Sequence, residues 1–463
     1  MLPSSVDYIF LGSSPCNTYI ASVCARIGKS VVVIDRDSAY GSWSTSHNLT
    51  SFQNWHKNLP TSDDDFCHFF HPFSINESIL SPVPDSFSTP QFSKSFSIDI
   101  IPLVHPCGSR IIDFFTKSLI HNYLSFQEPG PMVYFNSKFE PLQLPLSKKA
   151  VFQAKISPRE KRNLVKLIDD LIGFEGDDVS VSDFLSSYQL PESLVSAFTN
   201  YLPYFTSSSP QSNLMVHNFK NSVQKFISGV GRFGPDFGLV FNRYGSSEVS
   251  QSFVRQVAVH GGLTLTNCHV SKLIEDQNSI SIELPFELED GGSRAQMSFQ
   301  KLIIDVSQFP SFSNRDYFPI SSRICRCVVF SNTPIKISDQ ILTTFCFDYQ
   351  TILFFGFQYD FSKMKCSPQG VYMVHFWTHF DHDDVILNIQ SKIDCLIQEL
   401  KTKFDFDPFY SAGYIQNCFE NNLIDHDSLI VVNDCPIIPS LEKSFELSEK
   451  VGSLLVPDVE FPF

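Results

Sequence analysis

The stretch VDYIFLGSSPCNTYIASVCARIGKSVVVIDRD near the start of the chain constrains the fold more than any other part of the sequence. Residues 6–11 predict a short apolar strand, Gly12 permits a sharp turn, and apolar residues at helical spacing predict a helix that Gly28 ends. The run SVVVID then predicts a strand of the continuous apolar kind that is buried in parallel sheets, with Asp35 at its end. This order of elements is the layout of a dinucleotide-binding unit.

The turn of this unit lacks two of the glycines that dinucleotide binding uses. The fingerprint G-x-G-x-x-G requires glycine at positions 12, 14 and 17, whereas the sequence has Gly12, Ser14 and Asn17. The second glycine lets the backbone approach a pyrophosphate, and the third lets helix and strand pack closely. We therefore predict a scaffold that has lost its dinucleotide, with Gly12, Ser14, Asn17 and Asp35 as a vestigial nucleotide turn and no cofactor.

Composition and charge narrow the classes of protein further. The chain has 463 residues, enough for two or three domains, and a formal net charge of −15. No tract of Lys and Arg is long enough to follow a phosphate backbone, which argues against nucleic acid as a partner. No basic leader precedes the first apolar run, and no apolar run reaches the ~18 residues of a membrane span. The 12 cysteines form no C-x-x-C pair, so we expect no zinc site and mostly buried free thiols in the cytosol.

The middle of the chain differs in pattern from both ends. Residues 55–97 are polar, acidic and rich in Ser and Pro, which predicts a long loop. Helical patterns follow, and the clearest is SPREKRNLVKLIDDLIG, in which Ser157 and Glu160 form a capping box and Gly173 ends the helix.

Strand and helix patterns alternate again after residue 239. TILFFGFQY, GVYMVHFWT and SLIVVND read as strands, and DDVILNIQSKIDCLIQELKTKF reads as an amphipathic helix. We predict an α/β fold with a FAD/NAD-binding Rossmann-like domain that has no cofactor and an inserted all-helical domain. The first domain is expected to be discontinuous, over 1–105 and 225–463, and the helical domain to cover 106–224.

Three segments resemble the superfamily of Rab escort proteins and Rab GDP-dissociation inhibitors. The opening stretch does so through Asp35, Arg36, Tyr40 and Gly41. GRFGPDFGLVFNRYGSSEVSQSFVRQVAVHGGLTLTN follows the family pattern at nearly every anchor, and SIDIIPLVHPCGSRIIDFF resembles a third segment. The resemblance spans most of the chain and implies a protein that binds Rab GTPases and carries no chemistry itself.

Local features favour the escort branch over the inhibitor branch. AVFQAKISPREKRNLVKLI resembles an escort segment, with one residue fewer between Phe and Arg, and RICRCVVF and GVYMVHFWT resemble two others. The length is closer to that of the inhibitors, so a GDP-dissociation inhibitor stays open. A flavin oxidoreductase with a degenerate fingerprint is the alternative from a different class.

The escort resemblance implies specific partners. They are GDP-bound Rab GTPases, unprenylated and prenylated, the Rab geranylgeranyltransferase α/β heterodimer, and the geranylgeranyl lipid on Rab. The protein would then be accessory component A of the transferase, and it would associate with membranes transiently from the cytosol.

The resemblance also assigns roles to individual residues. Rab-binding residues are Tyr40, Glu248, Arg255 and Leu265; residues of a mobile loop are Arg232, Phe233 and Phe237; transferase-binding residues are Phe152 and Arg162. From composition alone, the charged residues would be solvated surface groups, the loop an ordinary Gly-rich connection and Phe152 a core residue. No nucleophile–base constellation and no metal-ligand spacing is found, so no catalytic residue and no metal are predicted.

Overall fold

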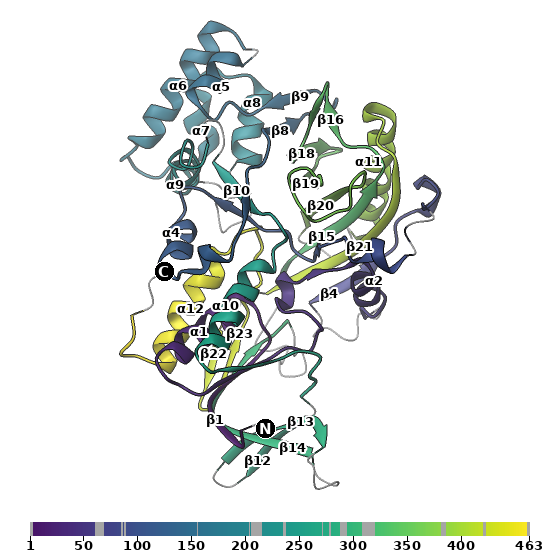
Figure 1. Ribbon diagram of the computed structural model, residues 1–463. Helices are drawn as coiled ribbons and strands as arrows, with labels where there is room; N and C mark the ends of the chain where they lie inside the picture. Colours follow the sequence, from purple (N-terminus) through teal and green to yellow (C-terminus); the bar gives the residue numbers. More distant parts are fainter. Residues whose placement is uncertain are drawn as a thin grey trace.

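The computed structural model describes residues 3–60, 69–84, 87, 89–154, 156–202, 204, 215–234, 238–270, 272–276, 279–287, 294–307, 320–380, 386–419 and 423–460. Two large sheets and a group of helices make up the molecule (Figure 1). The first sheet has the order β11-β2-β1-β14-β13-β12, with β23 and then β22 joined to β14. Its strands are β1 (Ser5–Leu11), β2 (Val31–Ile34), β11 (Leu263–Leu265), β12 (Lys272–Asp276), β13 (Ser279–Glu287), β14 (Arg294–Asp305), β22 (Leu423–His426) and β23 (Leu429–Val432).

The predicted strand–helix–strand unit is present in this sheet. Strands β11, β2, β1, β14 and β23 run parallel, and all four residues of β2 are buried. Helices α1 (Pro15–Arg26), α10 (Glu248–Val259) and α12 (Glu442–Leu455) pack together beside it (Figure 1). Tyr19 on α1 joins them through ring contacts with Phe253 at 5.2 Å and Phe445 at 5.8 Å between centroids. This arrangement orients the N-terminus of α1 toward the carboxyl ends of the parallel strands.

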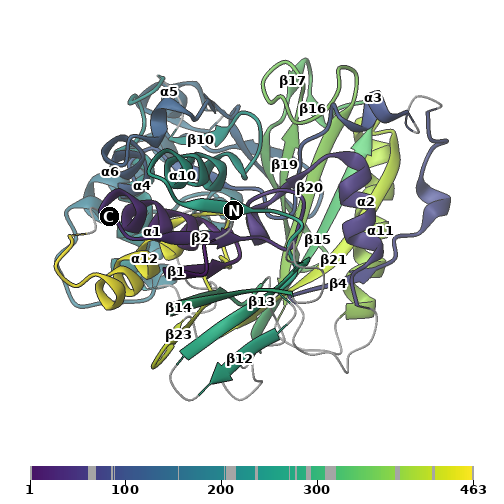
Figure 2. The ribbon, with the colours of Figure 1, turned by 60° about the horizontal axis from the view of Figure 1, so that its bottom comes forward.

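The second sheet has the order β4-β21-β15-β20-β19-β18-β8-β9, and helix α11 (Ile386–Phe404) covers its outer face (Figure 2). Its strands are β4 (Phe70–Phe73), β8 (Met132–Phe135), β9 (Pro141–Gln143), β15 (Ile320–Ser331), β18 (Thr344–Tyr349), β19 (Ile352–Tyr359), β20 (Tyr372–Phe380) and β21 (Pro408–Phe419). Ile393 and Ile397 of α11 are buried against this sheet in one core. The other face joins the first sheet in a continuous core. The predictions for β19, β20, β23 and α11 are confirmed.

The helical group consists of α5 (Lys148–Gln153), α6 (Pro158–Ile172), α7 (Val181–Ser186), α8 (Glu192–Ser196), a π-helical turn η5 (Ala197–Tyr201) and α9 (Val216–Ile227). The predicted capping box is formed, because Ser157 Oγ accepts from the Glu160 backbone and Glu160 Oε2 accepts from Ser157 N at 2.6 Å. Of the five apolar residues whose spacing predicts the buried face of this helix, Leu164, Leu167 and Leu171 are buried, Ile168 is partly buried and Ile172 is 38% exposed. The amphipathic pattern thus predicted both the start of α6 and its buried face.

Two secondary-structure predictions were wrong. The range 106–224 is not all helical, because β7 (Phe126–Gln127), β8 and β9 lie within it and β8 pairs with β18. The pattern of a four-residue apolar run such as MVYF fits a buried helix and a buried strand equally well. Which of the two forms depends on the elements that the run packs against. The predicted loop 55–97 contains the end of α2 (Leu49–Lys57), followed by β4 and α3 (Pro90–Ser93). Phe70 and Phe87 are buried there. Packing of these aromatic rings therefore gives the otherwise polar segment a defined structure.

Candidate functional site

The turn between β1 and α1 is closed by the chain's own side chains. Gly12 has φ of +92°, and a Cβ at this position would lie 2.5 Å from Asp305 Cβ. Ser14 caps α1, since its Oγ accepts from Asn17 N at 3.4 Å. Asn17 Nδ2 donates to the carbonyls of Leu11 at 3.2 Å and Gly12 at 3.1 Å. Asn17, which stands at the position of the third glycine of the fingerprint, therefore connects the start of α1 to the end of β1 by hydrogen bonds.

A carboxylate of the chain lies at the N-terminus of α1. Asp434, just after β23, accepts from Cys16 N at 3.0 Å and from Trp43 Nε1 at 2.8 Å. All of these groups are buried. Helix N-termini attract anions, and here the Asp434 carboxyl takes the position of an anion, while burial raises its pKa.

A dinucleotide does not fit this turn. The fold class binds a pyrophosphate at the N-terminus of this helix, but the Cys16 N–H already donates to Asp434 and the buried Trp43 ring packs beside that carboxylate. The prediction of a vestigial turn identified Ser14 and Asn17. It missed Asp434 and Trp43, because no local signal connects residues 391 positions apart.

Asp35 organises the loop that follows β2. Its carboxylate accepts from Ser13 N at 3.1 Å, from the Ser13 hydroxyl and from Asp37 N at 2.9 Å. Gly41 N in turn donates to Ser13 Oγ at 2.7 Å, which fixes the residue after Tyr40. Burial, with a smaller contribution from the nearby Asp37 charge, raises the pKa of Asp35 to about 7.

Three of the four predicted Rab-binding residues lie at the carboxyl edge of the first sheet. Leu265 ends β11 beside β2, and its carbonyl accepts from Asp35 N at 2.8 Å. Tyr40 lies in the loop after β2 and is half-buried. Glu248 begins α10, the helix that leads into β11, so it lies at the same edge of the sheet. Arg255 is two turns further along α10, about 10.5 Å away along the axis.

The two charged residues of α10 have different surroundings. Glu248 Oε2 accepts from Tyr244 N at 3.2 Å. Burial, with a smaller contribution from the Asp99 charge, raises the pKa of Glu248 to about 7. Arg255 is exposed, and its guanidinium lies 4.6 Å from the ring centroid of Tyr123. A solvated surface charge therefore describes Arg255 but not Glu248. The sequence pattern missed Tyr123, which no motif singles out.

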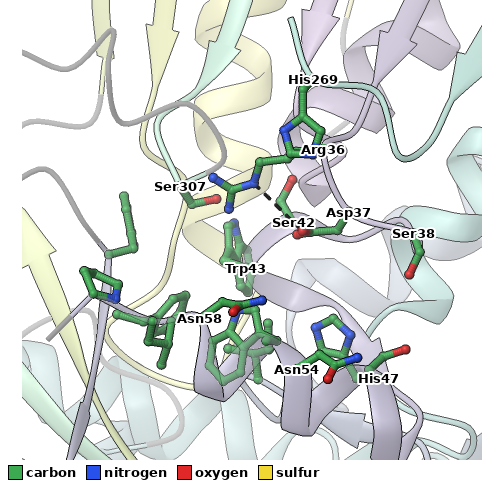
Figure 3. A pocket seen from close by; sticks show the side chains of 17 residues that line it. Arg36, Asp37, Ser38, Ser42, Trp43, His47, Asn54, Asn58, His269 and Ser307 are labelled. Atoms are coloured by element: carbon green, nitrogen blue, oxygen red, sulfur yellow. Dashed lines mark ion pairs between the residues drawn. The ribbon is translucent and has the colours of Figure 1, made fainter. Parts of the chain in front are cut away.

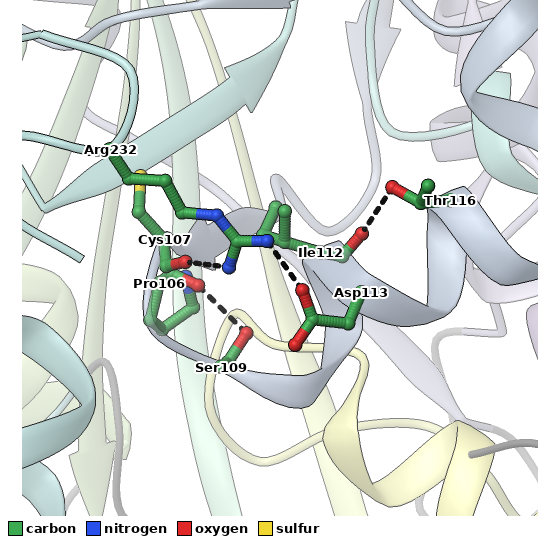
Figure 4. Close-up of polar contacts among 7 residues, drawn as sticks. All are labelled: Pro106, Cys107, Ser109, Ile112, Asp113, Thr116 and Arg232. Carbon is green, nitrogen blue, oxygen red and sulfur yellow. Dashed lines mark hydrogen bonds and ion pairs between the residues drawn. The ribbon is translucent and has the colours of Figure 1, made fainter. Parts of the chain in front are cut away.

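The predicted mobile loop is attached to α4 (Arg110–Lys117) by Arg232 (Figure 4). Arg232 Nη1 donates to the Cys107 carbonyl at 2.9 Å, and Nη2 forms an ion pair with Asp113. Phe233 is half exposed, with the Arg232 guanidinium 5.5 Å from its ring centroid. Phe237 lies outside the described residues. The described part of the loop thus has one polar attachment and one exposed aromatic ring.

Phe152 is the most exposed large apolar side chain among the described residues, at 83%. It lies in α5, and Lys161 of α6 donates to its carbonyl at 2.6 Å with its ammonium 5.8 Å from the ring centroid. Arg162 is also exposed, on the adjacent helix α6. The interpretation of Phe152 as a core residue is excluded for the isolated chain, since its ring faces solvent.

Neither a metal cluster nor a membrane span is found in the described part of the chain. It contains no group of three or more His, Cys, Asp or Glu residues that could hold a metal ion. None of its helices is both long and apolar enough to cross a bilayer. The cysteines described there are free thiols, and all but Cys395 are buried.

The fold and the turn together define a protein of the flavin-oxidoreductase fold class whose nucleotide turn is filled by its own side chains. A Rab GDI from Plasmodium falciparum matches 99% of this chain and 100% of its own with a TM-score of 0.71 at 13% identity. An oxidoreductase from Methanosarcina mazei matches 92% and 94% of the two chains with a TM-score of 0.55 at 11% identity.

Comparison of sequences identifies a narrower group of relatives than comparison of structures does. No family model matches the chain. "Rab escort protein 1" of Arabidopsis thaliana is 27% identical over 65% of this chain and 60% of its own length. "Rab proteins geranylgeranyltransferase component A" of Saccharomyces cerevisiae is 26% identical over 67% and 50%. The chain is a distant homologue of the Rab escort proteins, and the alignments span 50–60% of the length of these two relatives.

Proposed function

We propose that this protein is a Rab escort protein. It binds GDP-bound Rab GTPases, presents their C-terminal cysteines to the Rab geranylgeranyltransferase α/β heterodimer, shields the attached lipid and delivers prenylated Rab to membranes from the cytosol. The distant homology supports the family, and the Asp434 carboxylate at the N-terminus of α1 carries the argument for a binding role over flavin chemistry. The β1–α1 turn keeps the geometry of a nucleotide-binding fold, but the Asp434 side chain lies where the nucleotide's phosphate would bind.

The Rab-binding surface in this proposal is the edge formed by the loop after β2, the start of α10 and the end of β11. Tyr40, Glu248 and Leu265 supply an aromatic, an acidic and an aliphatic group at this edge. Arg255 extends the surface along α10 and is held over the Tyr123 ring by a cation–π contact. Such a mixture of aromatic and charged groups is typical of protein-recognition surfaces.

The transferase-binding surface is the exposed face of α5 and α6. An exposed aromatic ring next to fixed basic side chains can fill a pocket on a partner, and such anchors carry much of the binding energy. Phe152, Lys161 and Arg162 form this group. This surface distinguishes an escort protein from a GDP-dissociation inhibitor, which has no need to bind the transferase.

The decisive experiment is prenylation of a Rab by the transferase heterodimer in the presence of this protein. Phe152→Ala should abolish most prenylation and transferase binding while Rab affinity and melting temperature stay unchanged, because the ring is exposed. Phe361→Ala is the matched control. Phe361 is also exposed, and Lys365 both donates to its carbonyl at 2.8 Å and lies 3.7 Å from its ring centroid.

Rab binding is tested separately from transferase binding. Arg255→Ala combined with Glu248→Ala should weaken Rab affinity by roughly 2–4 kcal/mol if these are energetic hot spots. Unchanged Rab affinity would show that the Rab surface has been misplaced. Normal prenylation with Phe152→Ala, together with intact Rab binding, would show that Phe152 is not a transferase-binding residue. Rab binding by the unchanged protein without any prenylation would favour the GDP-dissociation inhibitor, and flavin released in stoichiometric amount on denaturation would favour the oxidoreductase.

A further inference from the structure

A cavity of about 540 Å³ lies beyond the carboxyl ends of β2 and β14, outside the filled nucleotide turn (Figure 3). Arg36 and Asp37 after β2, Ser307 after β14 and residues of α2 line it. In parallel sheets with helices on their faces, ligands bind at this edge where the strand order reverses. The volume is within the 300–1,000 Å³ that is typical of small-molecule sites.

Aromatic rings form the wall of the cavity. Trp43 and Trp55 both line it, together with Phe70. Trp55 lies 5.5 Å from Phe70 and 5.1 Å from Tyr414 between ring centroids, both in edge-to-face geometry. Trp43 is fixed by its Nε1 hydrogen bond to Asp434. The wall is therefore rigid. Trp43 is 1% exposed and supports the wall from behind, whereas Trp55 is half-buried and offers the planar surface on which a flat ring could stack.

A buried imidazole in the lining has both ring nitrogens free. His47 is 4% exposed and stacks on Trp55 with centroids 6.1 Å apart, and neither Nδ1 nor Nε2 has a hydrogen-bond partner among the described residues. Buried polar atoms without partners are uncommon in folded proteins and call for an explanation. Asn54 of α2 and Asn58, which caps the C-terminus of this helix, add two amides to the lining of the cavity (Figure 3).

The charges that line the cavity cancel. Arg36 Nε lies 3.9 Å from Asp37 Oδ1, and burial lowers the pKa of His47 to about 4, so its ring is neutral at pH 7. The whole chain has a formal charge of −15, which disfavours approach of an anion. The lining therefore suits a molecule without net charge that has hydrogen-bond donors and acceptors on a flat ring.

We propose that this cavity binds an uncharged heteroaromatic molecule, a nucleoside or free nucleobase. Its ring stacks against Trp55, and its edge hydrogen-bonds with His47, Asn54 and Asn58. The neutral imidazole provides one donor and one acceptor, and each amide provides both, which matches the mixed edge of a base. The lining shares the loop after β2 with the surface proposed for Rab, and it is separate from the surface proposed for the transferase.

Intrinsic fluorescence can test this site, because two of the three tryptophans line the cavity and Trp377 lies on β20. Adenosine, guanosine, cytidine and uridine are titrated singly into the full chain, with adenosine monophosphate as the charged probe and calorimetry as the second readout. At least one nucleoside should give saturable quenching. Its affinity should fall at least tenfold in Asn54→Ala/Asn58→Ala and stay unchanged in Gln53→Ala, an exposed residue of α2 outside the lining.

Arg36→Gln separates an uncharged ligand from an anion. Nucleoside affinity should stay within threefold of the unchanged protein, because the ring and amides carry the binding. The proposal is overturned if no nucleoside binds. It is also overturned if adenosine monophosphate binds more tightly than adenosine and loses that advantage in Arg36→Gln, since the cavity would then be an anion site. The melting temperature of each variant is measured in parallel, and a folded Asn54→Ala/Asn58→Ala variant with full affinity contradicts the assigned residues.

Discussion

Asn17 and Asp434 together replace what a dinucleotide would supply at the β1–α1 turn. The amide of Asn17 bonds the carbonyls at the end of β1, and the carboxylate of Asp434 accepts the Cys16 N–H where a pyrophosphate would lie. Gly12 is retained for a different reason. Its φ is +92°, and a Cβ on this residue would lie only 2.5 Å from Asp305 Cβ, so there is no room for a side chain, whatever the turn binds.

Gly12→Ala should therefore destabilise the protein by roughly 2–4 kcal/mol, from left-handed backbone strain and steric overlap with Asp305. Gly28→Ala is the matched control. Gly28 also has a positive φ, +89°, but a Cβ there would have no atom within 4 Å, so only the strain of about 1 kcal/mol remains. Urea unfolding of both variants measures the difference. Equal losses of stability would mean that Asp305 moves aside.

Glu248 links Rab recognition to pH in the proposed function. Its pKa is raised to about 7, mainly by burial, so the carboxylate is largely protonated at pH 6 and largely charged at pH 8. If the charged form contacts Rab, affinity should increase as pH rises through 7. Rab binding measured at pH 6, 7 and 8 tests this, with Glu248→Gln expected to be weaker and flat across the range. A pH profile that is unchanged by Glu248→Gln would remove this residue from the interface.

Among the elements, the α4–loop contact and the α5–α6 pair show how surface segments are held. The loop after α9 is attached through Arg232 to Cys107 and Asp113, before and on α4. The α5–α6 pair is joined by Lys161, which donates to the Phe152 carbonyl, and the capping box fixes the start of α6. In both cases a charged side chain fixes a segment while an aromatic ring, Phe233 or Phe152, faces solvent.

Arg232→Gln should loosen the loop without unfolding the protein, because the ion pair with Asp113 is partly exposed and contributes at most about 1 kcal/mol. Amide hydrogen exchange should become faster at residues 229–234 and stay unchanged in α6. Arg159→Gln is a control, since Arg159 donates to Gln189 in the helical group instead. Unchanged exchange at the loop would mean that its backbone turn, closed by Gly231 N and the Gly234 carbonyl at 3.0 Å, is sufficient.

At the scale of the whole molecule, buried carboxyls and buried histidines have opposite effects on how the stability of the fold depends on pH. Burial is the main cause in each case: it raises the pKa of Asp99 to about 6, of Asp35 to about 7 and of Asp305 to about 8. It also lowers the pKa of buried histidines, to about 4 for His47 and about 3 for His105, His375 and His379. The histidines destabilise the fold below pH 6.5, whereas the carboxyls stabilise it in their protonated form.

The free energy of unfolding should therefore fall as pH rises from 6.5 to 8.5. From about pH 7.5 the histidines are largely neutral in both states, and between pH 6.5 and 7.5 their remaining opposite effect is small. A carboxyl with a raised folded pKa loses its stabilising contribution as pH rises through that pKa. Asp305→Asn should reduce this fall by up to a few kcal/mol, because the amide stays neutral. Chemical unfolding at pH 6.5, 7.5 and 8.5 is the measurement. A stability that is constant over this range would show that Asp305 is already ionised at pH 6.5.

The sequence by itself determined the strand–helix–strand unit, the capped helix α6 and the loss of two glycines, since each depends on residues within about 30 positions. Apolar periodicity and capping chemistry act locally and can be read from the chain. Only the tertiary structure decided that Asp434 and Trp43 fill the nucleotide turn, that β8 completes the second sheet and that Tyr123 supports Arg255. These contacts join segments far apart in the chain, and their energies depend on burial and orientation, which no local pattern records.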